Sequence, residues 1–227
     1  YMMYGDKRVL EINFDAMKRW VDFMTNDSLD KYLWTCAESD KKLWGKHYGD
    51  WLGLDAPAGS YIGSSNIDFI ASAFYAYSTE LLIKAGKVIG KDMSEYEMLY
   101  ENIVATFKKT FTEYNTQAEC TLALCFNLTE DRAKTASKLN ELVKNNGNRL
   151  QTGFVGTPYL LYALSENGYA ETAYSLLLQE EYPSWLYEVN HGATTIWEHW
   201  DGIRDDGTFW SSDMNSYNHY AYGSVVG

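Results

Sequence analysis

Apolar residues recur at helical spacing over most of this chain, and that periodicity constrains its fold more than any other feature. Between Leu10 and Met24 they stand at positions 10, 14, 17, 20, 21 and 24, on one face of a helix. The three prolines, at positions 57, 158 and 183, all fall between periodic segments, where they interrupt no helix. The strand-like runs are short and isolated. The sequence therefore predicts an all-α protein.

The same spacing predicts a series of helices joined by loops of unequal length. We expect helices over 10–24, 64–89, 94–114, 116–126, 129–143, 159–165, 169–179 and 215–226. Thr129 and Thr157 have the side chains of N-cap residues, and Pro158 suits a first helical position. The longer loops are 38–63, 146–157, 181–195 and 201–215, and their unequal lengths argue against a regular solenoid. This pattern is typical of a layered helical fold that carries its function on its loops.

The charge of the chain argues against some classes of partner, and the spacing of its cysteines argues against some kinds of cross-link and metal site. With 31 acidic and 19 basic side chains the net charge is −12, which argues against nucleic acid or an anionic membrane surface as partner. No apolar run reaches the roughly 18 residues that a membrane-spanning helix needs. Cys36, Cys120 and Cys125 lack CxxC spacing, so neither a disulfide framework nor a zinc site is expected. The length of 227 residues suits a single domain over 1–227.

Four loop segments combine aromatic residues with an acid, a histidine or an asparagine. They are KHYGDWLG, EEYPSWLYEVNHG, GATTIWEHWDG and SYNHYAYGS. Flat aromatic faces pack against the C–H faces of a sugar ring, and glycoside hydrolysis usually needs two carboxyl groups flanking one bond. The segments therefore predict a concave polar and aromatic pocket. The residues that these segments single out are His47, Asp50, Trp51, Trp185, Tyr187, His191, Trp197, Glu198, Trp200, Asp201, Tyr217, Asn218, His219 and Tyr220.

Simpler interpretations compete with a sugar site. The tryptophans could belong to the core, and Glu198 could be a solvated helical residue. A metal site built from the four histidines is disfavoured, because the spacing of His191 and His199 fits no common ligand pattern. The segment GSYIGSS lacks the nucleophile elbow of a serine hydrolase, and no GxGxxG motif marks a nucleotide fold.

An ordered set of motifs nevertheless resembles one family. TGFVGTPYLLYALSENGY, YPSWLY, GATTIWEHWDG and NSYNHYAYGSV together resemble the catalytic domain of bacterial α-L-rhamnosidases, glycoside hydrolase family 78. YGDKRVLEINFDAMKRWVDF and YGDWLG fit earlier parts of the same domain. The resemblance covers nearly the whole chain in the same order, which makes the set more specific than any single motif.

The resemblance implies an (α/α)6-barrel-type helical toroid and inverting hydrolysis of terminal α-L-rhamnosides. In an inverting enzyme one carboxylic acid protonates the leaving oxygen and a second carboxylate activates water. By the family pattern Glu198 is the general base, and Trp197 and Trp200 shape and dry the pocket. Asp50 and Trp51 are expected at the substrate, and His219 at a sugar hydroxyl. Trp185 is expected either at the substrate or in the core. The implied partner is a rhamnose-containing glycoside or polysaccharide, without metal or other cofactor.

The chain departs from the family pattern in one respect. Family members carry the general acid in a segment resembling D-x-P-x-R-D-E-R, and no such segment occurs here. About eight expected helices are also fewer than the twelve of a complete barrel. We therefore expect the C-terminal part of a catalytic domain, truncated at both ends and inactive or nearly so alone. Exposed apolar helix faces would favour a homo-oligomer.

Three other interpretations stay open on the sequence alone. Asp50 could itself supply the acid. The chain could be a non-catalytic rhamnoside-binding helical domain, or a structural scaffold that binds no sugar. The aglycone, the linkage and the cellular compartment are left undetermined.

Overall fold

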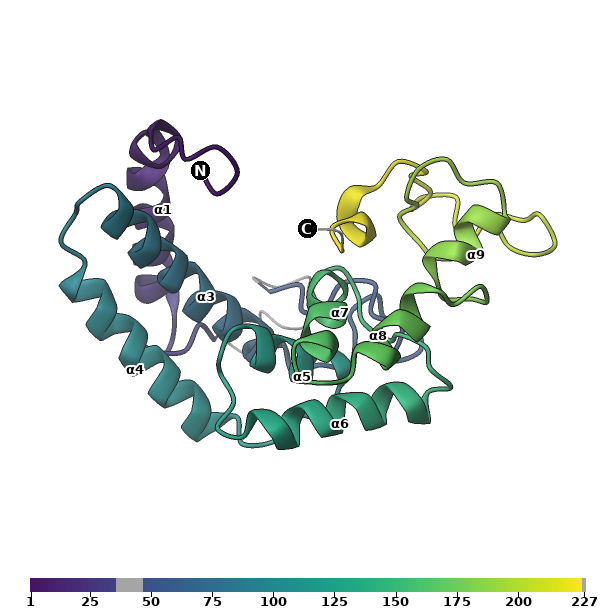
Figure 1. Cartoon of the computed structure of the whole chain (residues 1–227), viewed down its shortest axis with the longest axis horizontal. Coiled ribbons are helices and arrows are strands. Elements are labelled where there is room, and N and C mark those ends of the chain that lie inside the picture. Colours follow the sequence, from purple (N-terminus) through teal and green to yellow (C-terminus); the bar gives the residue numbers. More distant parts are fainter. Residues whose placement is uncertain (36–46, 226–227) are drawn as a thin grey trace. The chain divides into compact units, whose positions relative to one another are not determined.

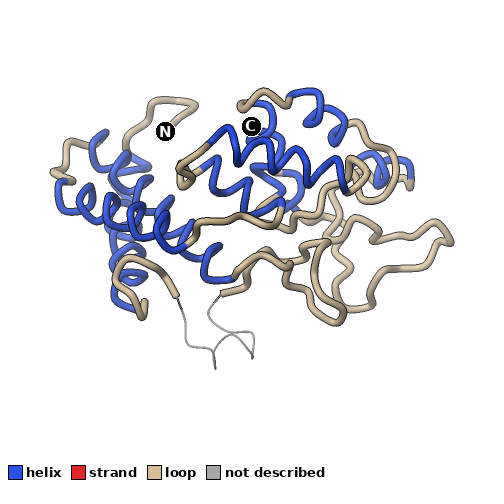
Figure 2. The backbone as a smooth tube through the Cα atoms, turned by 90° about the horizontal axis from the view of Figure 1, so that it is seen from below, coloured by secondary structure: helices blue, strands red, loops and turns tan. Residues whose placement is uncertain are grey.

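The structure is a computed structural model that describes residues 1–35 and 47–225 (Figure 1). Over these residues the chain forms eight α-helices and one 3-10 helix but no strand, and long loops join the helices (Figure 2). The all-α prediction is confirmed. The α-helices are α1 (Arg8–Asp27), α3 (Ile67–Val88), α4 (Ser94–Thr110), α5 (Gln117–Cys125), α6 (Arg132–Asn145), α7 (Thr157–Ser165), α8 (Ala170–Leu177) and α9 (Trp185–Asn190), and the 3-10 helix is η1 (Tyr220–Gly223).

The described residues separate into two compact units. The first comprises Tyr1–Tyr48 and Ile67–Glu113 and holds α1, α3 and α4. Its core contains Phe69, whose ring lies 5.0 Å from Phe107 and 5.4 Å from Phe111. Burying each such ring contributes about 1.5–3 kcal/mol, so this aromatic group holds α3 against α4.

The second unit comprises Gly49–Asn66 and Tyr114–Gly227. Helices α5, α6, α7 and α8 pack around one buried apolar cluster. Leu124, Leu139, Leu160 and Leu164 are all within 1% of complete burial in that cluster. The loops that carry the predicted site residues, except His47, belong to this unit and are supported by its core.

Two predicted helix starts are wrong. Thr129 is not an N-cap, because Asp131 accepts the cap hydrogen bond from the N–H of Lys134 and the helix begins at Arg132. The Thr129 hydroxyl is instead paired with that of Thr135. Thr157 is also not an N-cap but the first residue of α7, after Gly156. Each stretch offers neighbouring residues that suit a helix start, and the tertiary environment chooses between them.

The chain after position 180 also differs from expectation. The predicted loop 181–195 contains α9, which Ser184 caps by accepting from the N–H of Tyr187. The helix predicted over 215–226 is wrong over 215–225, the part of it that the structure describes, because only η1 forms there. The N–H of His219 donates instead to the carbonyl of Ile196 at 2.8 Å. Pairing with a distant segment replaces the local hydrogen bonds of a helix.

Part of the predicted loop 38–63, as well as Cys36 and Val226, lies outside the described residues. No helix within 1–35 or 47–225 is long and apolar enough to cross a membrane. Over the same residues, no group of three histidine, cysteine or acidic side chains is arranged to hold a metal ion.

Candidate functional site

Two segments from the last third of the chain lie side by side and form the centre of the site. The N–H of Glu198 donates to the carbonyl of Ser216 at 2.9 Å, and that of His219 donates to Ile196 at 2.8 Å. The Thr195 hydroxyl also donates to the carbonyl of Tyr217. These bonds place the TTIWE and NSYNH motifs next to each other, although no sheet forms.

Glu198 has one carboxylate oxygen held and the other open. Its Oε2 accepts a hydrogen bond from the N–H of Ser216 at 3.1 Å. Its Oε1 lies 3.9 Å from Nδ1 of His219, which is too long for a hydrogen bond. The Glu198 side chain keeps 16% of its surface exposed, and that of His219 keeps 33%. The arrangement is that of an oriented, partly exposed carboxylate with one oxygen in a hydrogen bond and a histidine beside the other.

His219 is supported by an aromatic residue from another loop. Its ring lies 5.0 Å from that of Phe154, tilted by 33°. Phe154 packs in turn against Tyr222 at 4.9 Å, and its N–H donates to the carbonyl of Trp51 at 2.9 Å. The loop 151–156 thus links the Asp50–Trp51 segment to the Glu198–His219 pair.

Asp50 is buried and bound to the main chain of that loop. Its Oδ2 accepts from the N–H of Gly153 at 2.7 Å, and its Oδ1 accepts from Val155 at 3.0 Å and Gly156 at 3.1 Å. The side chain is about 1% exposed. Burial raises the pKa of Asp50 to about 6, and the three amide donors act in the opposite direction. In this structure both oxygens of the carboxyl group organise the loop.

Trp51 is the most accessible of the predicted tryptophans. It is half-buried, and its ring lies 5.7 Å from Tyr61. Tyr61 extends the row to Trp210 at 6.2 Å, and Trp210 stacks on His199 at 3.8 Å. Aromatic rings therefore run from the Asp50 loop to the residue that follows Glu198.

The other three predicted tryptophans, Trp185, Trp197 and Trp200, are buried. Trp200 stacks on Tyr222 at 4.3 Å and meets Trp185 edge-on at 5.2 Å. The Nε1 of Trp185 donates to the carbonyl of Tyr222 at 2.9 Å. These contacts join Trp185, Trp200 and Tyr222 into one buried aromatic group. That any of the three touches a substrate stays a prediction, as it does for Asp50, Trp51 and His219.

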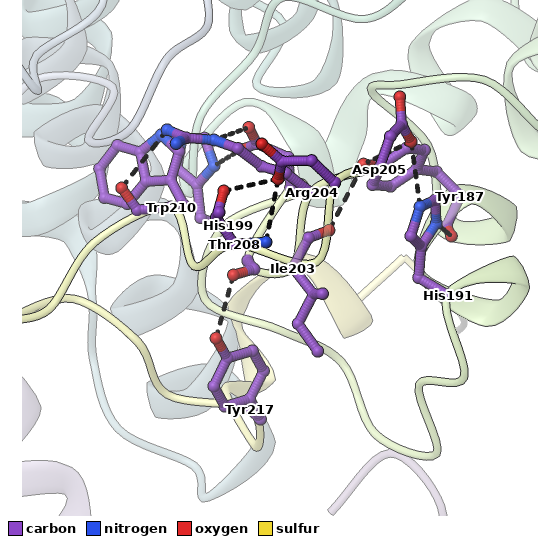
Figure 3. A network of polar contacts seen from close by, with 12 residues as sticks. Tyr187, His191, His199, Ile203, Arg204, Asp205, Thr208, Trp210 and Tyr217 are labelled. Atoms are coloured by element: carbon purple, nitrogen blue, oxygen red, sulfur yellow. Dashed lines mark hydrogen bonds and ion pairs between the residues drawn. The ribbon is translucent and has the colours of Figure 1, made fainter.

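The structure adds a polar network that the sequence interpretation did not resolve (Figure 3). His199 Nδ1 lies 2.5 Å from Asp201, which is also 3.4 Å from Arg204. A neighbouring group joins His191 Nε2 to Asp205 at 3.0 Å and the Tyr187 hydroxyl to the same carboxylate at 3.3 Å. The motif GATTIWEHWDG contains two of these residues, but nothing in its spacing shows which side chains pair.

Glu188 is a buried acidic residue that sequence reasoning missed. It lies on α9 with 1% of its surface exposed, and its Oε2 accepts from the N–H of Trp197 at 3.1 Å. Burial raises the pKa of Glu188 to about 8. A glutamate three positions after Trp185 is consistent with either a surface or a core position, so no sequence signal separates the two.

Comparisons with known proteins agree on one family. The family model for the bacterial alpha-L-rhamnosidase 6 hairpin glycosidase domain matches residues 1–227. An alpha-L-rhamnosidase of Formosa agariphila is 36% identical over 99% of this chain and 24% of its own length. One from Streptomyces avermitilis is 36% identical over 99% of this chain and 21% of its own length.

Solved structures show the same relationship. The crystal structure of Streptomyces avermitilis alpha-L-rhamnosidase complexed with L-rhamnose matches with a TM-score of 0.86 at 36% identity, over 98% of this chain and 21% of that one. The native enzyme from Aspergillus terreus matches with a TM-score of 0.85 at 32% identity, over 98% and 26%. This chain spans about a fifth to a quarter of the length of the relatives it matches.

Proposed function

Because this chain belongs to the bacterial α-L-rhamnosidase six-hairpin glycosidase family, we propose that it acts in the hydrolysis of terminal α-L-rhamnosides, with Glu198 as general base. The resemblance seen in the motifs is confirmed by the family match over residues 1–227. The helical structure and the six-hairpin domain also fit the predicted α/α toroid.

One observation carries the proposal for Glu198. A general base must be oriented and must keep an oxygen free to take a proton from water. The Ser216 amide holds Oε2, whereas Oε1 accepts no hydrogen bond from a described residue and lies on a partly exposed side chain. Glu198 meets both requirements, and it stands in the TTIWE segment in which the family carries its base.

The proposed reaction is inverting and needs a second carboxyl group. That group protonates the leaving oxygen from a position roughly 6.5–9.5 Å from the base. Asp50 is poorly suited to this role, because it is buried and its two oxygens accept hydrogen bonds from three main-chain amides. The D-x-P-x-R-D-E-R segment that would carry the acid is absent from these 227 residues. We therefore assign the acid to protein outside them.

The other contacts that we propose with the sugar are assigned to predicted site residues whose side chains are partly exposed. His219 is a third exposed and adjoins Glu198, which supports the proposal that its ring hydrogen-bonds a sugar hydroxyl. Trp51 is half-buried and offers a ring to an apolar sugar face. The buried tryptophans exclude water beneath them, which strengthens the electrostatic interactions of the site.

The decisive experiment measures hydrolysis of an aryl α-L-rhamnoside by the full-length protein and identifies the first sugar product by NMR. We expect turnover that releases the β-anomer first and is lost in Glu198→Gln. Glu171→Gln, an exposed change on α8, is the matched control and should leave the rate unchanged. Retention of configuration would contradict the inverting mechanism. Rhamnoside binding without turnover would favour a binding module instead.

A further inference from the structure

Glu188 is a buried carboxyl group that the proposed mechanism does not use. It lies on α9 and is 1% exposed. Its Oε1 is buried and has no hydrogen-bond partner among the described residues. Burying a polar group with so little compensation is costly, and an apolar side chain would fill the same space at lower cost. The position therefore calls for an explanation other than packing.

The contacts of Glu188 supply that explanation. Its Oε2 accepts from the N–H of Trp197 at 3.1 Å, and its carbonyl accepts from Ala193 at 3.0 Å. One residue thus holds the loop 191–197 near both of its ends. Trp197 directly precedes Glu198, so the held N–H, which belongs to the Ile196–Trp197 peptide unit, lies one peptide unit before the one that joins Trp197 to the proposed base.

We propose that Glu188 is a positioning residue for Glu198, acting through the hydrogen bond to the Trp197 amide. This inference rests on the proposed function, because it concerns the geometry of the same base. Glu198 is held from the other side by its two bonds with Ser216. The base therefore stands between two anchors, one buried beneath the loop and one in the facing segment.

The protonation state of Glu188 suits this role. Because burial raises its pKa to about 8, the carboxyl group is mostly neutral at pH 7 and avoids burying a charge. A neutral acid still accepts through its carbonyl oxygen. Glutamine has the same shape and acceptor, so it should replace the protonated form. Methionine has a similar volume but only a weak acceptor.

The test compares Glu188→Gln with Glu188→Met in the full-length protein acting on an aryl α-L-rhamnoside. We expect Glu188→Gln to retain kcat within roughly twofold. Glu188→Met should lose kcat by roughly 10- to 100-fold with little change in KM, since small misplacements of a catalytic group have effects of that size. Hydrogen exchange at the Trp197 amide should accelerate in Glu188→Met and not in Glu188→Gln.

Ile103→Ala is the control for a general loss of stability. Ile103 is fully buried in α4, in the other compact unit, so the change weakens the packing of that unit and alters no residue of the loop. It should leave kcat of the folded protein intact. A wild-type kcat in Glu188→Met would overturn the positioning role. So would a loss of activity that is proportional to the unfolded fraction in Glu188→Met and Ile103→Ala alike. If wild type itself shows no turnover, the proposed function fails first and the positioning role fails with it.

Discussion

The main-chain N–H of Ser216 donates to the side chain of Glu198 at 3.1 Å, while the N–H of Glu198 donates to the carbonyl of Ser216 at 2.9 Å. One residue therefore fixes both the backbone and the carboxylate of the proposed base. Ser216 does this entirely through its main chain, so the identity of its side chain is not what the base depends on.

This relationship predicts opposite outcomes for two changes at one position. Ser216→Pro removes the N–H that holds Oε2, and we expect kcat on an aryl α-L-rhamnoside to fall by roughly 10- to 100-fold. Ser216→Ala keeps the N–H and should retain the wild-type kcat. Thermal melting of both variants checks that the fold is preserved. Equal activity of the two would show that this hydrogen bond does not orient the base.

Asp50→Asn should destabilise the protein. Asparagine keeps one acceptor oxygen, but its NH2 group replaces the second. That NH2 group would face a main-chain N–H that now donates a hydrogen bond to the carboxylate, so two donors would meet. A buried donor left without a partner costs about 1–3 kcal/mol. Denaturant unfolding measures the change, with the exposed Asp213→Asn as control. Unchanged stability combined with lost turnover would instead favour Asp50 as the general acid.

Glu188 should make stability fall as pH rises. Its pKa is about 8 in the folded protein against an ordinary value of 4.5. In the window between these two pH values the unfolded chain releases a proton that the folded protein keeps. Below that window both states are protonated. Within it, stability should fall by up to about 1.4 kcal/mol per pH unit, and above it the loss levels off.

Glu188→Gln should remove that slope. The best window is pH 7 to 8, because Asp50, whose pKa is about 6, has then completed most of its own titration. Unfolding free energies of wild type and variant should converge at low pH and diverge toward pH 8, with the variant the more stable. Parallel curves would mean that Glu188 titrates normally.

Gly153→Ala should be more damaging than Gly156→Ala. A Cβ at position 153 would lie 2.2 Å from the carbonyl oxygen of Trp51 and 2.6 Å from the N of Gly53, both main-chain atoms. At position 156 it would meet only side-chain carbons, at 2.8 Å or more. Overpacking typically costs about 1–3 kcal/mol and sometimes more. The reverse order in thermal melting would contradict this close approach of the two loops.

The helices were largely predictable because their signal is local. Apolar spacing over 10–24 corresponds to α1, and that over 64–89 corresponds to α3. Helix ends were less predictable where several suitable caps stand together, as Thr129 and Asp131 do. Helix α9 has only six residues, too few to show a period, and residues 216–219 pair with 195–198 in place of forming a helix. Local pattern is informative only where local hydrogen bonds dominate.

The sequence by itself determined the helical class, the family motifs and the choice of Glu198 as the candidate base. Only the tertiary structure decided how each carboxyl group is used. Glu188 and Glu198 both stand one or two residues from tryptophan or tyrosine, yet one is buried on an amide and the other is partly open. Asp50 bonds to amides more than a hundred positions away. Burial and long-range hydrogen bonds depend on segments that meet only in the folded chain. These two factors determine which carboxylate is left accessible to a substrate.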